Sequence, residues 1–353
     1  MVNILNKTIS RIKPIDKEAM ANAQTRQDNL TKPQGSMGIL EDISIRLAGI
    51  QGRTIPKIER KAIITMAGDH GVVAENIGNW PQEVTAQMVL NFLRGGAGIN
   101  VISRQIGARV IVVDMGVATR FEVDPRLVSI KIAPGTRNMA NGPAMTQEQA
   151  IRAVEAGIEI IDAEVEKGLD IVGTGDMGIG NTTPSAAICA IMTGRKVSEV
   201  TGRGTGLSDP QLKHKIAVIE KAISVNKPDA EKPLEVLSKV GGFEIAGLAG
   251  VMIGAAASRV AVVVDGFISG AAALIATAIA PGCKDYLFAG HLSTEPGHRF
   301  MLEHLGLKPL VNLEMRLGEG TGAALGISIV EAAARILSEM ATFSEAGVSE
   351  KEE

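Results

Sequence analysis

The chain contains few aromatic residues and no excess of positive charge. Aromatics make up 3% of its 353 residues, and the formal net charge is −3. Proteins that bind nucleic acids usually present a basic surface and aromatic side chains that stack on bases, so this class is not expected. Only two cysteines occur, Cys189 and Cys283, and they form no C-x-x-C pair. Their spacing favours reduced thiols in the cytoplasm over a disulfide or a zinc site.

Long apolar runs are also lacking. Residues 1–20 contain no apolar stretch of the kind that a secretory signal requires. The most apolar window, residues 245–264, is interrupted by Ser258 and Arg259, and an arginine in the middle of a membrane is costly. We therefore expect no membrane span, and we interpret this window as a buried helix followed by a strand.

Short apolar runs rich in β-branched residues recur along the chain. Continuous runs of this kind are typical of parallel strands covered on both faces, and segments of helical periodicity lie between them. The alternation predicts an α/β fold, a Rossmann-like, doubly wound, mainly parallel sheet of about six strands. The predicted strands are 62–66, 110–113, 169–172, 260–264, 285–288 and 312–317, and the predicted helices between them include 84–92, 146–167, 210–225 and 266–280.

Helical segments flank this alternation at both ends, at 16–29 and 323–340. Chain termini often lie close together in a folded domain. We therefore expect a small helical domain formed by residues 1–58 and 323–353, beside a large α/β catalytic domain formed by residues 59–322.

A glycine turn, Gly318-Glu319-Gly320, follows the last predicted strand and precedes a helix. In open α/β sheets ligands bind outside the carboxyl ends of the strands, which makes Glu319 a candidate catalytic base. An isolated glutamate in such a turn is more often a solvated surface residue, so the assignment depends on the rest of the sequence.

A glycine-rich segment, residues 173–184, follows another predicted strand. Gly173, Gly175 and Gly178 satisfy G-x-G-x-x-G, the fingerprint of a dinucleotide site and hence of an NAD-dependent oxidoreductase. The same segment also resembles a P-loop that lacks its lysine. Both patterns share backbone N–H groups at a helix N-terminus, which favour an anion. A nucleotide-binding protein without catalytic activity is a further alternative.

Polar residues also occur at the ends of other predicted strands. Asp69, Asp114 and Asp265 would converge on one crevice if they all pointed from strand ends of one sheet, although each alone could cap a helix. The polar segment 32–38 belongs to the same group of expected strand ends.

A possible metal set consists of His291, Glu295 and His298. Pro296 and Gly297 interrupt any helix that would align these side chains, so we expect no metal.

Taken together, these segments resemble a known family, the nicotinate-nucleotide:dimethylbenzimidazole phosphoribosyltransferases of cobalamin nucleotide-loop assembly. The similarity extends over nearly the whole chain, and its motifs are specific only in combination. The matching runs are 32–38 with Leu40 and Glu41, 67–72, 81–88, 95–97, 135–139, 175–184, 202–207, 290–298 and 317–323.

The resemblance implies a reaction and a catalytic base. Nicotinate mononucleotide would donate its phosphoribosyl group to 5,6-dimethylbenzimidazole, with inversion at the anomeric carbon, giving α-ribazole 5′-phosphate and nicotinate. The pyridinium ring leaves without an acid, whereas the attacking benzimidazole must lose a proton, and general-base catalysis is worth ~10²–10⁴-fold. The family assigns this role to the glutamate of Leu-Gly-Glu-Gly-Thr-Gly, which is Glu319.

The resemblance also implies the binding residues and the assembly. Asp176 stands where the family often has glutamate, which leaves its reach open, and Asp265 is the weakest assignment. No cofactor is implied, the partners are the two small-molecule substrates, and the protein is expected to be a homodimer. The acceptor site would contain Gln87, Trp80, Met88 and Leu317, and the phosphate and ribose site would contain Gly175, Asp176, Gly178, Ile179, Gly180, Asn181, Thr182, Lys215, Asp265 and Ser293.

Overall fold

The fold is centred on one parallel sheet, seen in a computed structural model that describes residues 4–204 and 206–349. Its seven strands are ordered β3-β2-β1-β4-β5-β6-β7, and each neighbouring pair is parallel. Strands β1 to β3 therefore extend the sheet in one direction, and strands β4 to β7 extend it in the opposite direction. The prediction of a doubly wound α/β fold is confirmed.

The bounds of the elements follow the alternation expected from the sequence. The strands are β1 Lys61–Gly68, β2 Ala108–Gly116, β3 Leu127–Ser129, β4 Ile171–Met177, β5 Ala261–Val264, β6 Leu287–His291 and β7 Pro309–Val311. The helices are α1 Ile4–Arg11, α2 Lys17–Asn29, α3 Ile39–Gln51, α4 Val84–Arg94, α5 Gly98–Gln105, α6 Gln147–Glu166, α7 Thr182–Thr193, α8 Val197–Val200, α9 Asp209–Asn226, α10 Pro233–Val240, α11 Phe243–Ala257, α12 Phe267–Ile279, α13 Pro296–Leu305, α14 Thr321–Glu339 and α15 Phe343–Ala346, with 3₁₀ turns at Gly71–Glu75 and Pro281–Tyr286.

Helices cover both faces of the sheet. Helices α5 and α14 pack together on one face, against β2 and against β4, β5 and β6 respectively. Helices α11 and α12 pack on the other face, and α6 packs on α11. Because the sheet is covered on both faces, its central strands are buried throughout, as in β4 from Ile171 to Asp176. This burial accounts for the continuous apolar runs in the sequence.

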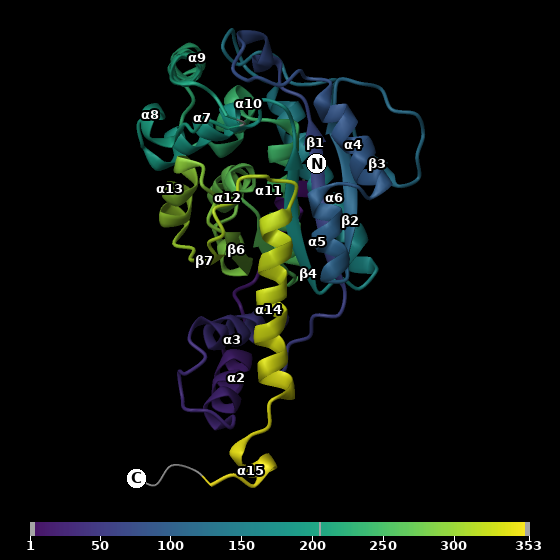
Figure 1. The fold of residues 1–353 in the computed structure, drawn as a ribbon, viewed down its shortest axis with the longest axis vertical. Helices are drawn as coiled ribbons and strands as arrows, with labels where there is room; N and C mark the ends of the chain where they lie inside the picture. The colour runs from purple at the N-terminus through teal and green to yellow at the C-terminus, as the bar shows by residue number, and fades with distance from the viewer. Residues whose placement is uncertain (1–3, 205, 350–353) are drawn as a thin grey trace.

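A small helical bundle lies at one end of the molecule, where α2 and α3 pack beside the end of α14 (Figure 1). It has its own buried cluster of Ala23, Ile45, Ala48 and Leu337. The first half of α14 instead packs on the sheet, and α1 packs on α6 and α11. The two-domain division therefore stays a proposal, with α1 and the start of α14 joined to the larger body.

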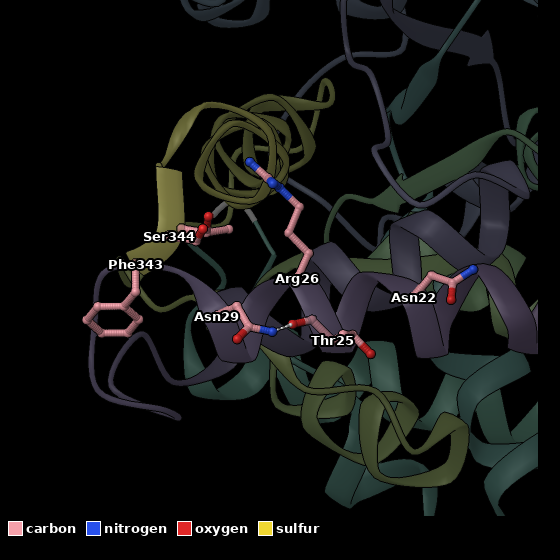
Figure 2. Close-up of a pocket in the computed structure, with 7 residues that line it drawn as sticks. Asn22, Thr25, Arg26, Asn29, Phe343 and Ser344 are labelled. Atoms are coloured by element: carbon pink, nitrogen blue, oxygen red, sulfur yellow. Dashed lines mark hydrogen bonds between the residues drawn. The ribbon is translucent and has the colours of Figure 1, made fainter. Parts of the chain in front are cut away.

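Arg26 of α2 fastens the C-terminus of α14 to the bundle. Its guanidinium donates to the carbonyl oxygens of Leu337, at 2.8 Å, and Met340, at 3.3 Å. A shallow hollow of about 340 Å³ lies beside it (Figure 2). The hollow contains no carboxylate, histidine or cysteine, and Asn29 there donates to the carbonyl of Thr25. We assign this hollow no chemistry.

Some expectations about the elements were wrong. Residues 312–317 form no strand, because the last strand ends at Val311 and the following segment leaves the sheet. Strand β3 was not predicted, since it is three residues long and only partly buried. Segment 32–38 is not at a strand end but lies between α2 and α3, where Lys32 donates to Glu41 at 2.8 Å.

Apolar helices are part of the folded core. The window 245–264 consists of α11 and β5 with buried residues, so the prediction of a buried helix and strand is confirmed. Among the described residues one helix, Thr321–Glu339, is long and apolar enough to cross a membrane by composition alone, with a mean hydropathy of 1.3. It packs on the sheet and α3, and 56% of its window is buried, as in a core helix.

Candidate active site

A cavity of about 680 Å³ opens at the carboxyl ends of β4, β5 and β6. The winding of the sheet reverses between β1 and β4, and ligands of such sheets bind at this switch point. The lining includes a polar group, made by residues 176–182 with Lys215, Ser293 and Glu295, and two exposed apolar side chains, Trp80 and Leu317; we call these two groups the polar end and the apolar end of the cavity. The remaining lining residues are Ile77, Gly78, Arg203, Gly204, Leu207, Gly266, Phe267, Ile268, His291, Glu314, Met315, Arg316 and Gly318.

The polar end is held in place by side chains from two helices, α4 and α9. Thr85 of α4 accepts a hydrogen bond from the N–H of Ile179 at 3.0 Å. Lys215 of α9 donates to the hydroxyl of Thr182 at 2.6 Å, so a lysine from another helix stands beside the glycine-rich loop that lacks one of its own. Burial lowers the pKa of Lys215 to about 8 despite the opposing charge of Glu295. A dianionic phosphate would restore the protonated form.

The glycines of the dinucleotide fingerprint serve a different purpose. Gly173 and Gly175 lie inside β4 rather than in a strand-to-helix turn. A Cβ atom on Gly175 would lie 2.3 Å from the carbonyl oxygen of Glu319. Glycine is therefore required here so that the Glu319 turn can approach the strand, and the oxidoreductase alternative loses its structural basis.

Glu319 lies in a tight turn directly before α14. The residue is 5% exposed and has a φ of 65°, between two glycines that also have positive φ. A residue other than glycine in this region is strained by about 1–3 kcal/mol, and the turn persists because its surroundings fix it. Thr65 donates to the Glu319 carbonyl at 2.9 Å, and the Glu319 N–H donates to the carbonyl of Asp176 at 3.2 Å. The alternative that Glu319 is a solvated surface residue is therefore wrong.

The Glu319 carboxylate sits at the N-terminus of α5. Its Oε2 accepts a hydrogen bond from the N–H of Ile99 at 3.1 Å. Burial raises the pKa of Glu319, the N–H of Ile99 opposes this rise, and the charge of Asp265 adds to it. The raised pKa makes Glu319 a stronger base than a solvated glutamate.

Asp265 caps α14 rather than lining the cavity. Its two carboxylate oxygens accept from the N–H groups of Gly320, at 3.1 Å, and Ala323, at 3.0 Å. The side chain is buried and is absent from the cavity wall. Its predicted contact with ribose is therefore not favoured, and we propose instead that Asp265 positions the Glu319 turn.

Asp176 lines the cavity as a buried carboxyl. Its Oδ2 accepts from the side-chain amide of Asn181 at 2.9 Å, whereas its Oδ1 has no hydrogen-bond partner in the described chain. Burial raises the pKa of Asp176 well above its usual range, and the charges of Asp265, Glu244 and Glu319 add to the rise. The neutral acid is thus favoured, which leaves a hydroxyl free to donate to a ligand.

The acceptor residues predicted from the resemblance are only partly brought together. Trp80 and Leu317 line the cavity at its rim and are 53% and 60% exposed. Gln87 and Met88 on α4 do not line it; Gln87 is exposed and Met88 packs partly against the core. The acceptor roles of all four remain proposals.

The other strand-end aspartates hold neighbouring loops. Asp69 accepts from the N–H of Ala118 at 2.8 Å, and Asp114 accepts from the N–H of Val117 at 2.8 Å. Like Asp265, neither lines the cavity, so the expected convergence of these three is wrong. The capping alternative holds for Asp265 alone, since Asp69 and Asp114 accept from N–H groups of a loop and not of a helix. The acidic residues that line the cavity are Asp176, Glu295 and Glu314.

His298 and Glu295 of the possible metal set interact with other residues. His298 accepts from the N–H of Ser293 at 2.9 Å, and burial lowers the pKa of His298 to about 3. Glu295 faces Lys215 and packs on Gly202. Across residues 4–204 and 206–349 no three His, Cys, Asp or Glu side chains form a group that could hold a metal ion. The absence of a metal from the reaction stays a prediction.

Sequence reasoning missed several residues that line or support the cavity. Arg203 and Arg316 line it, and Thr85 braces the glycine-rich loop. Arg203 lies in a turn that stands out for its glycines, and Arg316 lies in a predicted strand. The sequence around each arginine therefore gave no indication that its charge has a function. Thr85 lies on a helix far from the loop in sequence, and only the fold brings the two together.

Comparison with known proteins gives one consistent result. A family model described as "Phosphoribosyltransferase" matches residues 12–348. The nicotinate-nucleotide–dimethylbenzimidazole phosphoribosyltransferase of Dehalococcoides mccartyi (strain CBDB1) is 64% identical, covering 99% of this chain and 100% of the relative. The enzyme of the same name from Desulforudis audaxviator (strain MP104C) is 58% identical, covering 99% of each.

A solved structure agrees with these relatives. The crystal structure of the corresponding enzyme from Thermus thermophilus aligns with a TM-score of 0.91 and 47% identity, covering 96% of this chain and 100% of that one. The family model and the relatives each extend over nearly the whole sequence. The chain therefore belongs to the nicotinate-nucleotide–dimethylbenzimidazole phosphoribosyltransferase family and is an enzyme of that family.

Proposed function

We propose that the chain moves the 5-phosphoribosyl group of nicotinate mononucleotide to a nitrogen of 5,6-dimethylbenzimidazole, with Glu319 as the general base. The observation that carries this assignment is a buried glutamate of raised pKa that directly follows Leu317 and Gly318, two residues of the wall of a cavity that also contains a buried lysine. The Glu319 side chain itself does not line this cavity. The apolar and polar ends of the cavity suit a flat heteroaromatic acceptor and a phosphorylated donor.

The donor would bind at the polar end. Its phosphate would meet Lys215, the Thr182 hydroxyl and the backbone N–H groups at the start of α7, where a helix N-terminus favours an anion. Ser293 lines the same end. Asp176, when protonated, could donate to a ribose hydroxyl or the ring oxygen, in line with its unpartnered Oδ1.

The acceptor would bind at the apolar end, next to Glu319. A Cβ atom on Gly98 would lie 3.0 Å from Leu317 Cδ2 and 3.3 Å from Glu319 Oε2, so these two side chains meet at one point. There the carboxylate would remove the proton from one benzimidazole nitrogen while the other attacks the anomeric carbon. The bond to nicotinate breaks, and its electron pair neutralises the pyridinium, so no acid is needed.

Incubating the protein with nicotinate mononucleotide and dimethylbenzimidazole tests this function. Chromatography with mass detection should show nicotinate and ribazole 5′-phosphate forming in equal amounts. Omission of either substrate should abolish ribazole phosphate. Binding of the nucleotide without either product would instead support a non-catalytic nucleotide-binding protein.

We further propose that the enzyme acts in the cytoplasm as a homodimer. Both cysteines are buried free thiols, in keeping with a reducing compartment. Large apolar side chains are exposed at Leu90, Val101 and Val123 and could be covered by a second copy. Light scattering coupled to size exclusion should give twice the 36.9 kDa chain mass; a monomer at micromolar concentration would contradict the dimer.

A further inference from the structure

Three cationic side chains line the cavity, Lys215, Arg203 and Arg316, and two of them are already engaged. Lys215 is buried, donates to Thr182 and faces Glu295. Arg203 forms an ion pair with Asp209 and donates to the carbonyl of Leu207 at 2.7 Å.

Arg316 differs from both. It is exposed, and within residues 4–204 and 206–349 no hydrogen bond or ion pair to it is found. Its charge nevertheless acts on the polar end: burial raises the pKa of Glu295, and the positive charges of Lys215 and Arg316 oppose this rise. A cation free to bind a ligand therefore stands within electrostatic reach of Glu295.

The segment that carries Arg316 lines the cavity and is held on both sides of this residue. Leu317 is directed to Gly98 and Glu319, at the apolar end. The carbonyl of Met315 accepts from the N–H of Thr294 at 3.1 Å, which holds the segment alongside the loop that precedes Glu295. Arg316 lies between these two contacts, lines the cavity and acts through its charge on Glu295 of the polar end.

The proposed donor has two anionic groups, a phosphate on the ribose and a carboxylate on the pyridine ring. Lys215 and the start of α7 match the phosphate. A second cation would favour binding of the ring carboxylate, because Glu295 and Glu314 line the same cavity and would repel an unpaired anion. A guanidinium suits this task because it can bind a carboxylate with two parallel hydrogen bonds.

We propose that Arg316 pairs with the ring carboxylate of nicotinate mononucleotide and thereby selects the nicotinate nucleotide over the nicotinamide nucleotide. The two donors have nearly the same shape, but the nicotinamide nucleotide lacks the charge. This inference rests on the proposed transferase function. It adds a specificity residue that neither touches the acceptor nor takes part in proton transfer.

The test compares kcat/KM for the two donors, with dimethylbenzimidazole as acceptor, in the wild type, Arg316→Gln and Arg203→Gln. Loss of a charged hydrogen bond should lower kcat/KM for nicotinate mononucleotide by roughly 10–100-fold in Arg316→Gln. The value for nicotinamide mononucleotide should change by less than about threefold, because no charged pair is lost. Arg203→Gln, which removes the other cavity arginine, should leave the ratio between donors unchanged.

Product inhibition gives a second, independent readout. Nicotinate should inhibit Arg316→Gln more weakly than the wild type, and Arg316→Lys should recover part of the donor preference because it restores the charge without the bidentate geometry. Equal losses for both donors in Arg316→Gln, or an unchanged ratio in an active enzyme, would overturn this inference alone. A wild type that forms no ribazole phosphate from either donor would overturn the transferase proposal and this inference with it.

Discussion

The polar and apolar ends of the cavity differ in the burial and the hydrogen bonding of their side chains. At the polar end Lys215 is 2% exposed, and its ammonium group already contacts the Thr182 hydroxyl. At the apolar end Trp80 and Leu317 are 53% and 60% exposed. A preorganised polar site favours one charged ligand, whereas an open apolar rim distinguishes poorly between flat rings, since a methyl group is worth only ~1–3 kcal/mol. From this difference we expect stricter selection of the donor than of the acceptor.

Glu319 contacts Gly98 together with Leu317 of the apolar end, and its loss should have the largest effect. Glu319→Gln preserves shape and removes the base, so kcat should fall by at least about 100-fold while the Kd for nicotinate mononucleotide stays within about threefold. Steady-state kinetics and calorimetric titration measure the two quantities. Glu314→Gln, a change at another cavity glutamate, serves as the control. Undiminished kcat in Glu319→Gln would remove this residue from the proposed role.

Removal of Lys215 should affect the polar end alone. Lys215→Ala deletes a charged hydrogen-bond donor, so KM for nicotinate mononucleotide should rise by roughly 10–100-fold and KM for dimethylbenzimidazole should hardly change. Lys213→Ala, at an exposed lysine on the same helix, is the matched control and should leave both constants unchanged. A larger rise in KM for dimethylbenzimidazole would mean that Lys215 belongs to the acceptor site.

The pH dependence of kcat/KM for the nucleotide should separate the two ends, because this ratio reports groups in the free enzyme. Glu319 must be deprotonated, so activity should rise with pH through its raised pKa. Lys215 must be protonated, and its pKa is lowered to about 8, so activity should fall above that pH. In Lys215→Arg the fall near pH 8 should disappear, since arginine stays charged. An identical alkaline limb in that variant would assign the fall to another group.

Trp80 should give the smallest effect. Because half of its surface is solvent-exposed, Trp80→Ala removes only part of a stacking contact, and KM for dimethylbenzimidazole should rise by roughly 2–10-fold. KM for the nucleotide should not change, and Trp80→Phe should restore most of the acceptor affinity. A larger effect on the nucleotide would show that Trp80 belongs to the polar end.

Local patterns in the sequence predicted the fold and the position of the Glu319 turn. The apolar runs mark buried parallel strands, and Gly318 and Gly320 mark the tight turn that places the glutamate directly before α14, although the strand expected before this turn is absent. The choice of Lys215 over the neighbouring Lys213 came from the family resemblance, because spacing alone does not show which lysine is buried.

Interactions between distant segments could not be predicted in this way. Asp265 accepts from the N–H of Gly320, 55 residues further along the chain, so its capping role appears only when α14 is in place. Gln87 was assigned to the acceptor site by resemblance, yet its side chain is exposed outside the cavity. The charge of Arg316 had no local signature, since its partner would be the ligand.

Helix α14 begins at the Glu319 turn and ends in the small bundle (Figure 1). Its 19 residues span roughly 28 Å, and it is fastened at both ends, by Asp265 at its N-terminus and by Arg26 at its C-terminal carbonyls. Because α14 is held at both ends, a tilt of α2 against the sheet would shift the Glu319 carboxylate next to the N-terminus of α14. We therefore expect that substitutions in the bundle can slow turnover without weakening substrate binding.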